Sequence, residues 1–189
     1  PEAYPTAHST DIEPVMPVPV PPAQGPKLSL AQWPFAAGQA RADQSKTRRT
    51  LDLGKGQILD LVYIPAGEFI MGDPEGEPDE QPLSRARIDK PFWMGRTEVT
   101  NAQYARFDPS HDSRFQDKGS WMFNEWDLGW PLNQAQQPVI RVSCNDALAF
   151  CAWLSEQTGG QVTLPTEAQW EWACRAGSDT AFSFGDMDT

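Results

Sequence analysis

The sequence predicts an α+β fold, an irregular mixed α/β domain in which short strands and a few short helices are joined by much loop. Three observations carry this prediction. Strand-like runs fill much of residues 51–95, two capped amphipathic helices follow within 143–177, and a long polar and aromatic loop at 108–138 separates the two groups. Elements this short need one another for burial, so we expect a single compact unit.

The composition excludes some classes of partner. At 189 residues, the chain corresponds to one domain with extensions or to two small domains. Its net charge of −11 argues against nucleic acid and anionic membranes, which need a positive footprint. No apolar run is long enough to span a membrane. A protein or glycan partner fits better. The first residue is Pro1 rather than Met, so the natural start, with any export signal it carried, was either removed or not included. We expect an exported protein, periplasmic or extracellular.

The N-terminal part is proline-rich. Residues 1–34 contain nine of the 18 prolines, a composition that favours extended polyproline II conformation. This part is either a passive tether or, through the run at 15–22, a partner-recognition segment. Residues 36–50 have the composition of a short exposed helix. We therefore assign 1–50 to an extended arm or linker and 51–189 to the globular domain.

The strands are predicted in the first part of this domain. Residues 51–64 read as two strands around a Gly-Lys-Gly turn at 54–56. Residues 67–72 form another strand, and 86–95 a further strand with aromatic residues. The loop between them, 73–82, carries five carboxylates. Their spacing does not match an EF-hand, so we expect a solvated acidic loop rather than a calcium site.

Three helix starts share one signal, a Ser or Thr followed three residues later by a side chain that completes a capping box. The pairs are Thr100 and Gln103, Ser143 and Asp146, and Thr166 and Gln169. Glycines predict the ends of the two later helices, at Gly159 or Gly160 and at Gly177.

Apolar residues on the two later helices predict which side is buried. On the first, Ala147, Cys151 and Leu154 share one face. On the second, Trp170 and Trp172 both indicate packing.

The loop at 108–138 is long enough to be functional or irregularly packed. Its aromatic residues either line a binding surface or pack against the core. His111 beside Asp112 fits a general base or local hydrogen bonding in a turn. The candidate binding residues are His111, Trp121, Trp126 and Trp130. Phe123 is a further aromatic residue of the same loop.

The three cysteines leave several states open. Cys144 and Cys151 are seven residues apart on one predicted helix, about 10 Å along its axis, too far for a disulfide. Cys174 could pair with either, or with a cysteine outside this chain. A buried free thiol is the alternative for each. The chain has no HExxH, GxSxG, CxxC or phosphate-binding glycine motif, and its cysteine and histidine spacing does not predict zinc.

Four ordered segments resemble one family. They are IPAGEFIMG (64–72), FWMGRTEVTNAQYARF (92–107), QPVIRVSCNDALAFCAWL (137–154) and LPTEAQWEWACRAG (164–177). In this order they are similar to the formylglycine-generating enzyme, or sulfatase-modifying factor, family.

The resemblance implies a C-type-lectin-like fold. It also implies that enzymatic members oxidise a target cysteine to formylglycine with O₂ and copper. The copper cysteines and calcium-binding loops belong to the second half of the family's domain, after the position of Thr189. No catalytic, cofactor-binding or metal-binding residue is therefore transferred to this chain. Cys151 and Cys174 correspond to positions that form disulfides in some members, and Cys144 replaces a tryptophan.

Two functions follow from the resemblance. The intact protein is a cysteine-oxidising enzyme, or it is a non-catalytic binding or structural subunit of a larger assembly. Two closely spaced cysteines after residue 189 would favour the enzyme. A third interpretation, a non-haem iron oxidoreductase, lacks a histidine-rich site here. We expect the two later helices to need a cover, from the rest of the domain or a protein partner, and residues 1–189 alone to fold poorly.

Overall fold

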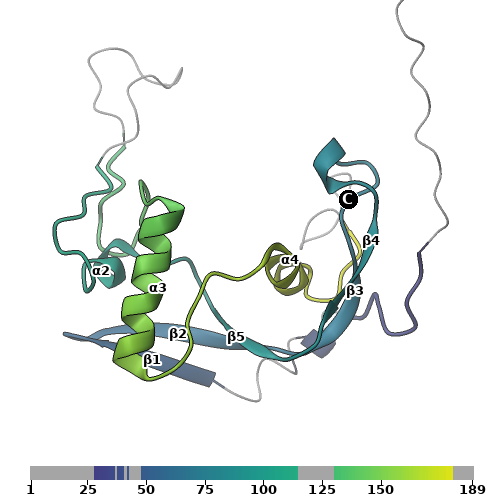
Figure 1. The fold of residues 1–189 in the computed structure, drawn as a ribbon, viewed down its shortest axis with the longest axis horizontal. Helices are drawn as coiled ribbons and strands as arrows, with labels where there is room; N and C mark the ends of the chain where they lie inside the picture. The colour runs from purple at the N-terminus through teal and green to yellow at the C-terminus, as the bar shows by residue number, and fades with distance from the viewer. Residues whose placement is uncertain (1–27, 37, 41, 43–47, 115–129, 181–189) are drawn as a thin grey trace, which may run out of the picture.

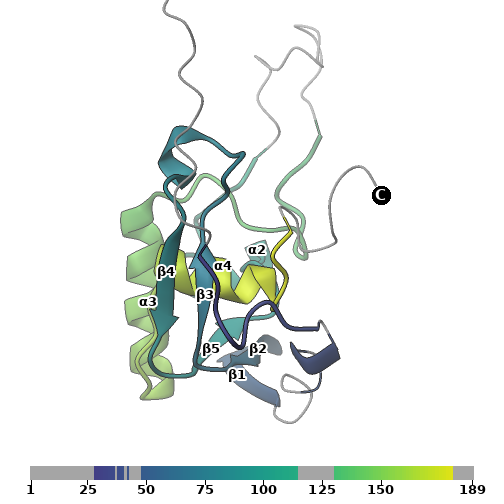
Figure 2. The ribbon, with the colours of Figure 1, turned by 90° about the vertical axis from the view of Figure 1, so that its right-hand side faces the viewer.

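The computed structural model describes residues 28–36, 38–40, 42, 48–114 and 130–180, and all structural statements below refer to these residues. Figure 1 shows a three-stranded sheet along one side of the molecule, helices above it, and a separate two-stranded ribbon. Seen from the side in Figure 2, this ribbon stands beside the helices rather than extending the sheet. The predicted mixed fold of short strands and few helices is confirmed.

The three-stranded sheet is antiparallel and has the order β1-β2-β5. Its strands are β1 (Arg48–Gly54), β2 (Gln57–Ile64) and β5 (Phe92–Gly95). The predicted turn between β1 and β2 is confirmed. Gly54, Lys55 and Gly56 all have positive φ, at 77°, 51° and 76°, a conformation that glycine adopts at little cost. Strand β1 begins three residues before the predicted boundary at 51, so residues 48–50 belong to the sheet.

The two-stranded ribbon pairs β3 (Gly67–Met71) with β4 (Ser84–Ile88). The acidic loop between them contains the short 3-10 helix η1 (Pro78–Glu80). The prediction of one strand over 86–95 was wrong, because this range ends β4 and then forms β5 in the other sheet. Pro91 separates the two strands and lacks the N–H that a continuous ladder would need.

All three predicted capping boxes are present. They begin α2 (Asn101–Tyr104), α3 (Cys144–Thr158) and α4 (Glu167–Arg175). Helix α3 ends at Gly159 in the left-handed conformation, as predicted. Helix α4 does not end at Gly177, because Ala176 already adopts the left-handed conformation with φ of 46°.

Two hydrophobic cores lie on either side of the molecule, and strand β2 contributes to both. The α3 core is formed by Leu53, Leu59, Tyr104, Phe150 and Leu154. The α4 core is formed by Trp33, Ile64, Phe69, Ile70, Ile88 and Trp172. Leu59 and Ile64 come from the two ends of β2, so one strand connects the two packed regions.

Three packing details differ from the expectations. Trp170 is 55% exposed whereas Trp172 is buried, because residues two apart on a helix point about 200° apart. Trp33 lies in the α4 core although the sequence placed it in the extended arm. Residues 38–40 and 42 are helical, as expected for 36–50, but Ala40 is buried.

Candidate functional site

Trp172 lies where α4 contacts β3. Its side chain is 5% exposed, and its indole Nε1 donates a hydrogen bond to the carbonyl oxygen of Pro65 at 2.8 Å. The ring centroid is 5.5 Å from that of Phe69. A Cβ atom on Gly67 would lie 2.6 Å from the indole ring, far inside van der Waals contact. Residue 67 therefore has to be glycine if Trp172 is to reach the Pro65 carbonyl.

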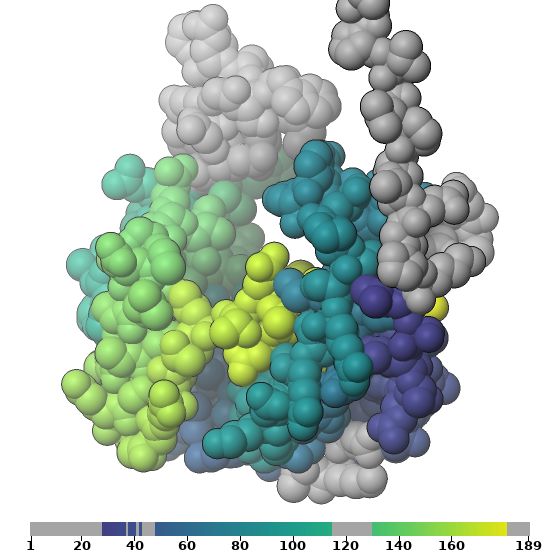
Figure 3. Space-filling view, turned by 45° about the vertical axis from the view of Figure 1, so that its right-hand side comes forward, coloured from purple at the N-terminus to yellow at the C-terminus, as the bar shows by residue number. Residues whose placement is uncertain are grey.

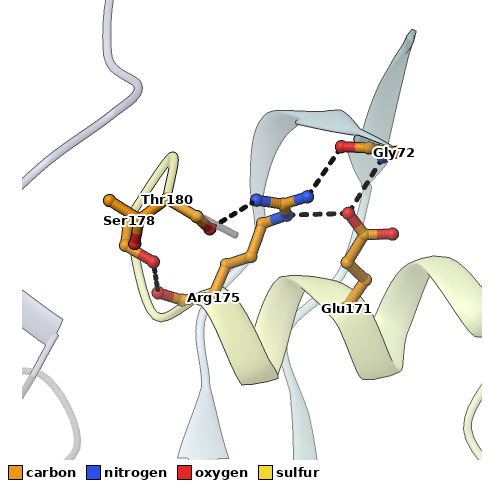
Figure 4. Close-up of polar contacts among 5 residues, drawn as sticks. All are labelled: Gly72, Glu171, Arg175, Ser178 and Thr180. Atoms are coloured by element: carbon orange, nitrogen blue, oxygen red, sulfur yellow. Dashed lines mark hydrogen bonds and ion pairs between the residues drawn. The ribbon is translucent and has the colours of Figure 1, made fainter. Parts of the chain in front are cut away.

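A polar network next to Trp172 joins the same helix to the end of β3 (Figure 4). Glu171 Oε1 accepts hydrogen bonds from the backbone N–H of Gly72 at 3.0 Å and from Arg175 Nε at 2.7 Å. Arg175 Nη2 donates to the Gly72 carbonyl oxygen at 2.7 Å. Both polar groups of Gly72 are thus satisfied by one ion pair. We call Gly72, Glu171, Trp172 and Arg175 the α4–β3 joint.

The joint also fixes the turn after α4. Arg175 Nη1 donates to the Thr180 carbonyl at 3.2 Å, and Ser178 Oγ donates to the Arg175 carbonyl at 2.9 Å. The Arg175 and Glu171 side chains are only 14% and 19% exposed. Such shielded, multiply bonded charges stabilise one geometry and offer no free nucleophile. Their i,i+4 spacing was visible in the sequence, but their partner about 100 positions earlier was not.

A second polar cluster closes the long loop at its base. Asn101 Nδ2 lies within hydrogen-bond distance of the carbonyl oxygens of Leu132 (2.9 Å), Gln134 (2.9 Å) and Gln137 (3.2 Å). The backbone N–H of Leu132 donates to the Arg114 carbonyl at 2.8 Å. The two ends of the segment between residues 114 and 132 therefore meet.

Ser113 ties this base together from inside. Its side chain is fully buried, and its hydroxyl donates to Asn101 Oδ1 at 2.6 Å. Ser113 Oγ also accepts a hydrogen bond from the backbone N–H of Ile140 at 3.1 Å. Neither Asn101 nor Ser113 was recognised from the sequence, because each acts on backbone groups distant along the chain.

His111 also contacts the base. Its Nε2 lies 2.9 Å from the Ile140 carbonyl oxygen, and its ring packs edge-on against Tyr104 at 5.0 Å. Burial raises the pKa of Tyr104, and the negative charges of Asp146 and Asp108 add to that effect. These contacts favour local hydrogen bonding for His111 over a role as general base.

Acidic side chains around the base are stabilised in the charged form. The Arg114 backbone N–H, followed by the Asn133 side chain, lowers the pKa of Asp112. The hydroxyl and backbone N–H of Ser143 lower the pKa of Asp146 at the start of α3. These carboxylates act as local hydrogen-bond acceptors.

The predicted binding loop is only partly visible. Trp130 is 67% exposed, at the base of the loop, whereas Trp121, Phe123 and Trp126 lie outside the described residues. A binding surface on this loop remains a prediction, and His111 and Trp130 are the two candidate residues that the structure describes.

The three cysteines are free thiols in separate surroundings. Cys144 and Cys174 are exposed, and Cys151 is buried, which raises its pKa. Cys144 and Cys151 are seven residues apart on α3, so they do not form the paired-thiolate site that copper needs. Within the described residues, no group of three or more His, Cys, Asp or Glu could bind a metal ion. The described part of the chain therefore does not fit a copper site.

One cavity adjoins the joint. It has a volume of about 670 Å³, and its walls include Leu30 and Phe35 on one side and Pro65, Glu68 and Trp172 on the other. Its size is within the range of ligand pockets. No helix in the described ranges is long and apolar enough to cross a membrane.

Known proteins resemble this chain over most of its length. Residues 47–189 match the family model described as the sulfatase-modifying factor enzyme 1-like domain. The formylglycine-generating enzyme of Bos taurus is 33% identical over 155 residues, covering 62% of this chain and 40% of the relative. The inactive C-alpha-formylglycine-generating enzyme 2 of Bos taurus is 31% identical over 166 residues, covering 68% and 53%.

A solved structure agrees with these matches. The structure of PvdO from Pseudomonas aeruginosa superposes with a TM-score of 0.55 at 31% identity, over 71% of this chain and 53% of PvdO. The chain spans about half the length of the proteins that it matches, between 40% and 53% for these three.

Proposed function

Because this chain belongs to the sulfatase-modifying factor enzyme 1-like domain family, we propose that it forms the N-terminal part of a formylglycine-generating domain. In the intact protein this domain converts the –CH₂–SH group of a target cysteine into the aldehyde of formylglycine, a two-electron oxidation in which the sulfur leaves as sulfide and O₂ accepts the electrons. The residues of this chain build the scaffold on which the reaction site is assembled.

The α4–β3 joint is the observation that supports this proposal most directly. Two of the family-like segments, 64–72 and 164–177, contact each other through it although about 100 residues separate them. The features that make these segments recognisable, Gly67, Gly72 and Trp172, are the ones that the contact requires. The two segments that resemble the family are therefore in direct contact in the fold of this chain.

The reacting groups are proposed to come from outside the described residues. The resemblance implies two copper-binding cysteines and O₂ as oxidant, and the cysteines described here do not fit that role. We assign Cys144, Cys151 and Cys174 no part in the oxidation, and disulfides from Cys151 or Cys174 remain predictions.

The partner in this proposal is protein. Trp170, Leu148 and Leu164 are 55%, 43% and 39% exposed, although they belong to or flank the two long helices. Figure 3 shows α4, in yellow, at the bottom of a hollow between α3 and the β3–β4 ribbon. We propose that the rest of the domain or a protein partner covers this face, with a glycan as the alternative ligand. Export to the periplasm or cell exterior is part of the same proposal, and fractionation of cells expressing the protein tests it.

Incubation with a target peptide tests the activity. The full-length protein, loaded with Cu(I), is mixed with a peptide containing a CxPxR sequence in the presence of O₂. We expect mass spectrometry to detect the mass change from thiol to aldehyde, and a hydrazide reagent to label the product.

A variant tests whether the exposed thiol of this chain takes part in the reaction. Cys144→Ser removes an exposed thiol that the proposal leaves out of the reaction, so it should retain activity. An unmodified peptide in the presence of folded, copper-loaded protein would instead indicate the non-catalytic subunit.

A further inference from the structure

Residues 28–36 pack against the domain although they precede the range 47–189 that matches the family model. Figure 3 shows this segment, in purple, lying along the blue and teal strands. We call residues 28–36 the N-terminal clasp. Its sequence is LSLAQWPFA, in which one aromatic residue lies on each side of a proline.

Trp33 is the main apolar contact of the clasp. It is 9% exposed and belongs to the α4 core together with Phe69 and Trp172. The clasp forms a tight local turn that presents this side chain, since the Trp33 N–H donates to the Leu30 carbonyl at 3.4 Å. Burial of a large aromatic side chain in a shared core makes such a contact strongly stabilising.

Phe35 makes the second contact, with α4 and the turn after it. Its backbone N–H donates to the Gly177 carbonyl oxygen at 2.9 Å, and its ring lies edge-on to Trp172 at 5.8 Å. A Cβ on Gly177 would lie 2.5 Å from the Phe35 ring. The glycine after α4 therefore accommodates the clasp, which gives Gly177 a role beyond ending the helix.

The clasp also forms one wall of the cavity of about 670 Å³. Leu30 and Phe35 line it together with Pro65 and Trp172. If the clasp left its position, this cavity would become an open groove beside the α4–β3 joint.

One buried polar atom of the clasp lacks a hydrogen-bond partner in the part of the chain that the structure describes. The indole Nε1 of Trp33 is buried without a hydrogen-bond partner among the described residues. An unpaired buried donor opposes burial, because its hydrogen bond to water is lost and not replaced. Among the described residues, the clasp is therefore held by apolar contacts and by the backbone hydrogen bond from Phe35 to Gly177, in the manner of a bound peptide.

We propose that the N-terminal clasp is a peptide ligand carried in the chain itself, and that the surface formed by Ile64, Phe69, Trp172 and Gly177 is its binding groove. The occupant of this groove is the Trp-Pro-Phe segment of the same molecule. Its dissociation exposes the groove and opens the cavity while the rest of the domain stays folded.

Hydrogen exchange on the full-length protein tests whether the clasp is bound in its groove. We expect slow exchange at the Phe35 amide, and Trp33→Ala should speed exchange over residues 30–36 by about a hundredfold or more. Exchange at Leu53 and Leu59, which lie in the α3 core, should stay unchanged. Gln32→Ala changes an exposed residue of the same segment and should leave exchange in the clasp and in the α3 core unchanged. Trp33→Phe keeps an aromatic ring and should preserve most of the slow exchange over residues 30–36. Fast exchange at Phe35 in the native protein would overturn the proposal, as would an equal rise everywhere in Trp33→Ala.

Binding in trans tests the groove. A fluorescent peptide of residues 28–36 should bind the full-length Trp33→Ala/Phe35→Ala variant, measured by anisotropy, and should bind the native protein at least tenfold more weakly because its groove is occupied. The same peptide with alanine at both aromatic positions is the control. Absence of binding to the folded variant, or equal binding by the control peptide, would show that the clasp is an inseparable part of the core.

Discussion

Trp172 shows how much of this fold depends on single side chains. It fills the α4 core, donates to Pro65, and contacts both Gly67 and the clasp residue Phe35. Composition predicted its packing, but equally that of Trp170, and the sequence alone could not say which of the two faced inward. The orientation of α4 on β3 decides this, and that orientation depends on Gly72, about 100 residues away.

Replacement of Trp172 should therefore be costly. We expect Trp172→Ala to lower the free energy of unfolding by about 3–5 kcal/mol, measured by urea denaturation, because it removes a buried ring and its hydrogen bond. Trp130→Ala is the matched control and should change stability by less than about 0.5 kcal/mol, since that side chain is 67% exposed. Similar losses in both variants would contradict the assigned packing.

Gly67 should tolerate no side chain. Gly67→Ala places a Cβ 2.6 Å from the Trp172 ring, and we expect a loss of about 1–3 kcal/mol in urea denaturation. Gly160→Ala is the control, because a Cβ there would lie at an ordinary contact distance of 3.6 Å from Thr158 Oγ1. Near-native stability of Gly67→Ala would show that Trp172 can move aside.

Among the helices and strands, features set by neighbouring residues could be predicted from the sequence, whereas those set by contacts distant along the chain could not. Each capping box predicted a helix start because its hydrogen bonds join residues three apart. The division of 86–95 into β4 and β5 was missed, since assignment to two sheets depends on strands elsewhere in the chain. The polar base around Asn101 and Ser113 was missed for the same reason.

The cap of α3 gives a pH-dependent prediction. Hydrogen bonds from Ser143 lower the pKa of Asp146 below its usual 3.8. The charged form is therefore favoured in the folded state, and its contribution is complete above the unfolded pKa and disappears as pH falls through the folded pKa. We expect Asp146→Asn to be less stable than the native protein at neutral pH, with a difference that shrinks below about pH 4.

Urea denaturation at several pH values measures this difference. Glu156→Gln removes one negative charge from the same helix without touching the cap, and so controls for net charge. A stability difference for Asp146→Asn that stays constant through the acid range would contradict the role of the charge.

At the scale of the whole molecule, two hydrophobic cores and an exposed apolar surface around α4 determine how the chain packs. Strand β2 contributes Leu59 to one core and Ile64 to the other, so the cores are connected through the backbone of one strand. The family and the mixed fold could be predicted from four sequence segments. The packing of the clasp could not, because proline-rich composition masks the two aromatic residues that anchor it.

A cover over α4 would change the behaviour of its exposed tryptophan. In the full-length protein we expect Trp170→Ser to lower stability or weaken assembly by about 1 kcal/mol or more, measured by thermal denaturation and light scattering. Exposure alone would predict almost no effect. Ile58→Ser, at a site 51% exposed on β2, is the control and should be near neutral. Equal, negligible effects would indicate that nothing packs on α4.

The closed base of the long loop has a consequence for how this domain can diversify. Because Arg114 and Leu132 are bonded to each other and Asn101 fixes the returning chain, the distance between the loop's ends does not depend on what lies between them. The entropic cost of a longer insertion rises only slowly with its length. The site between residues 114 and 132 is thus a natural position for exchange of sequences, where a new recognition segment could be grafted without altering the scaffold.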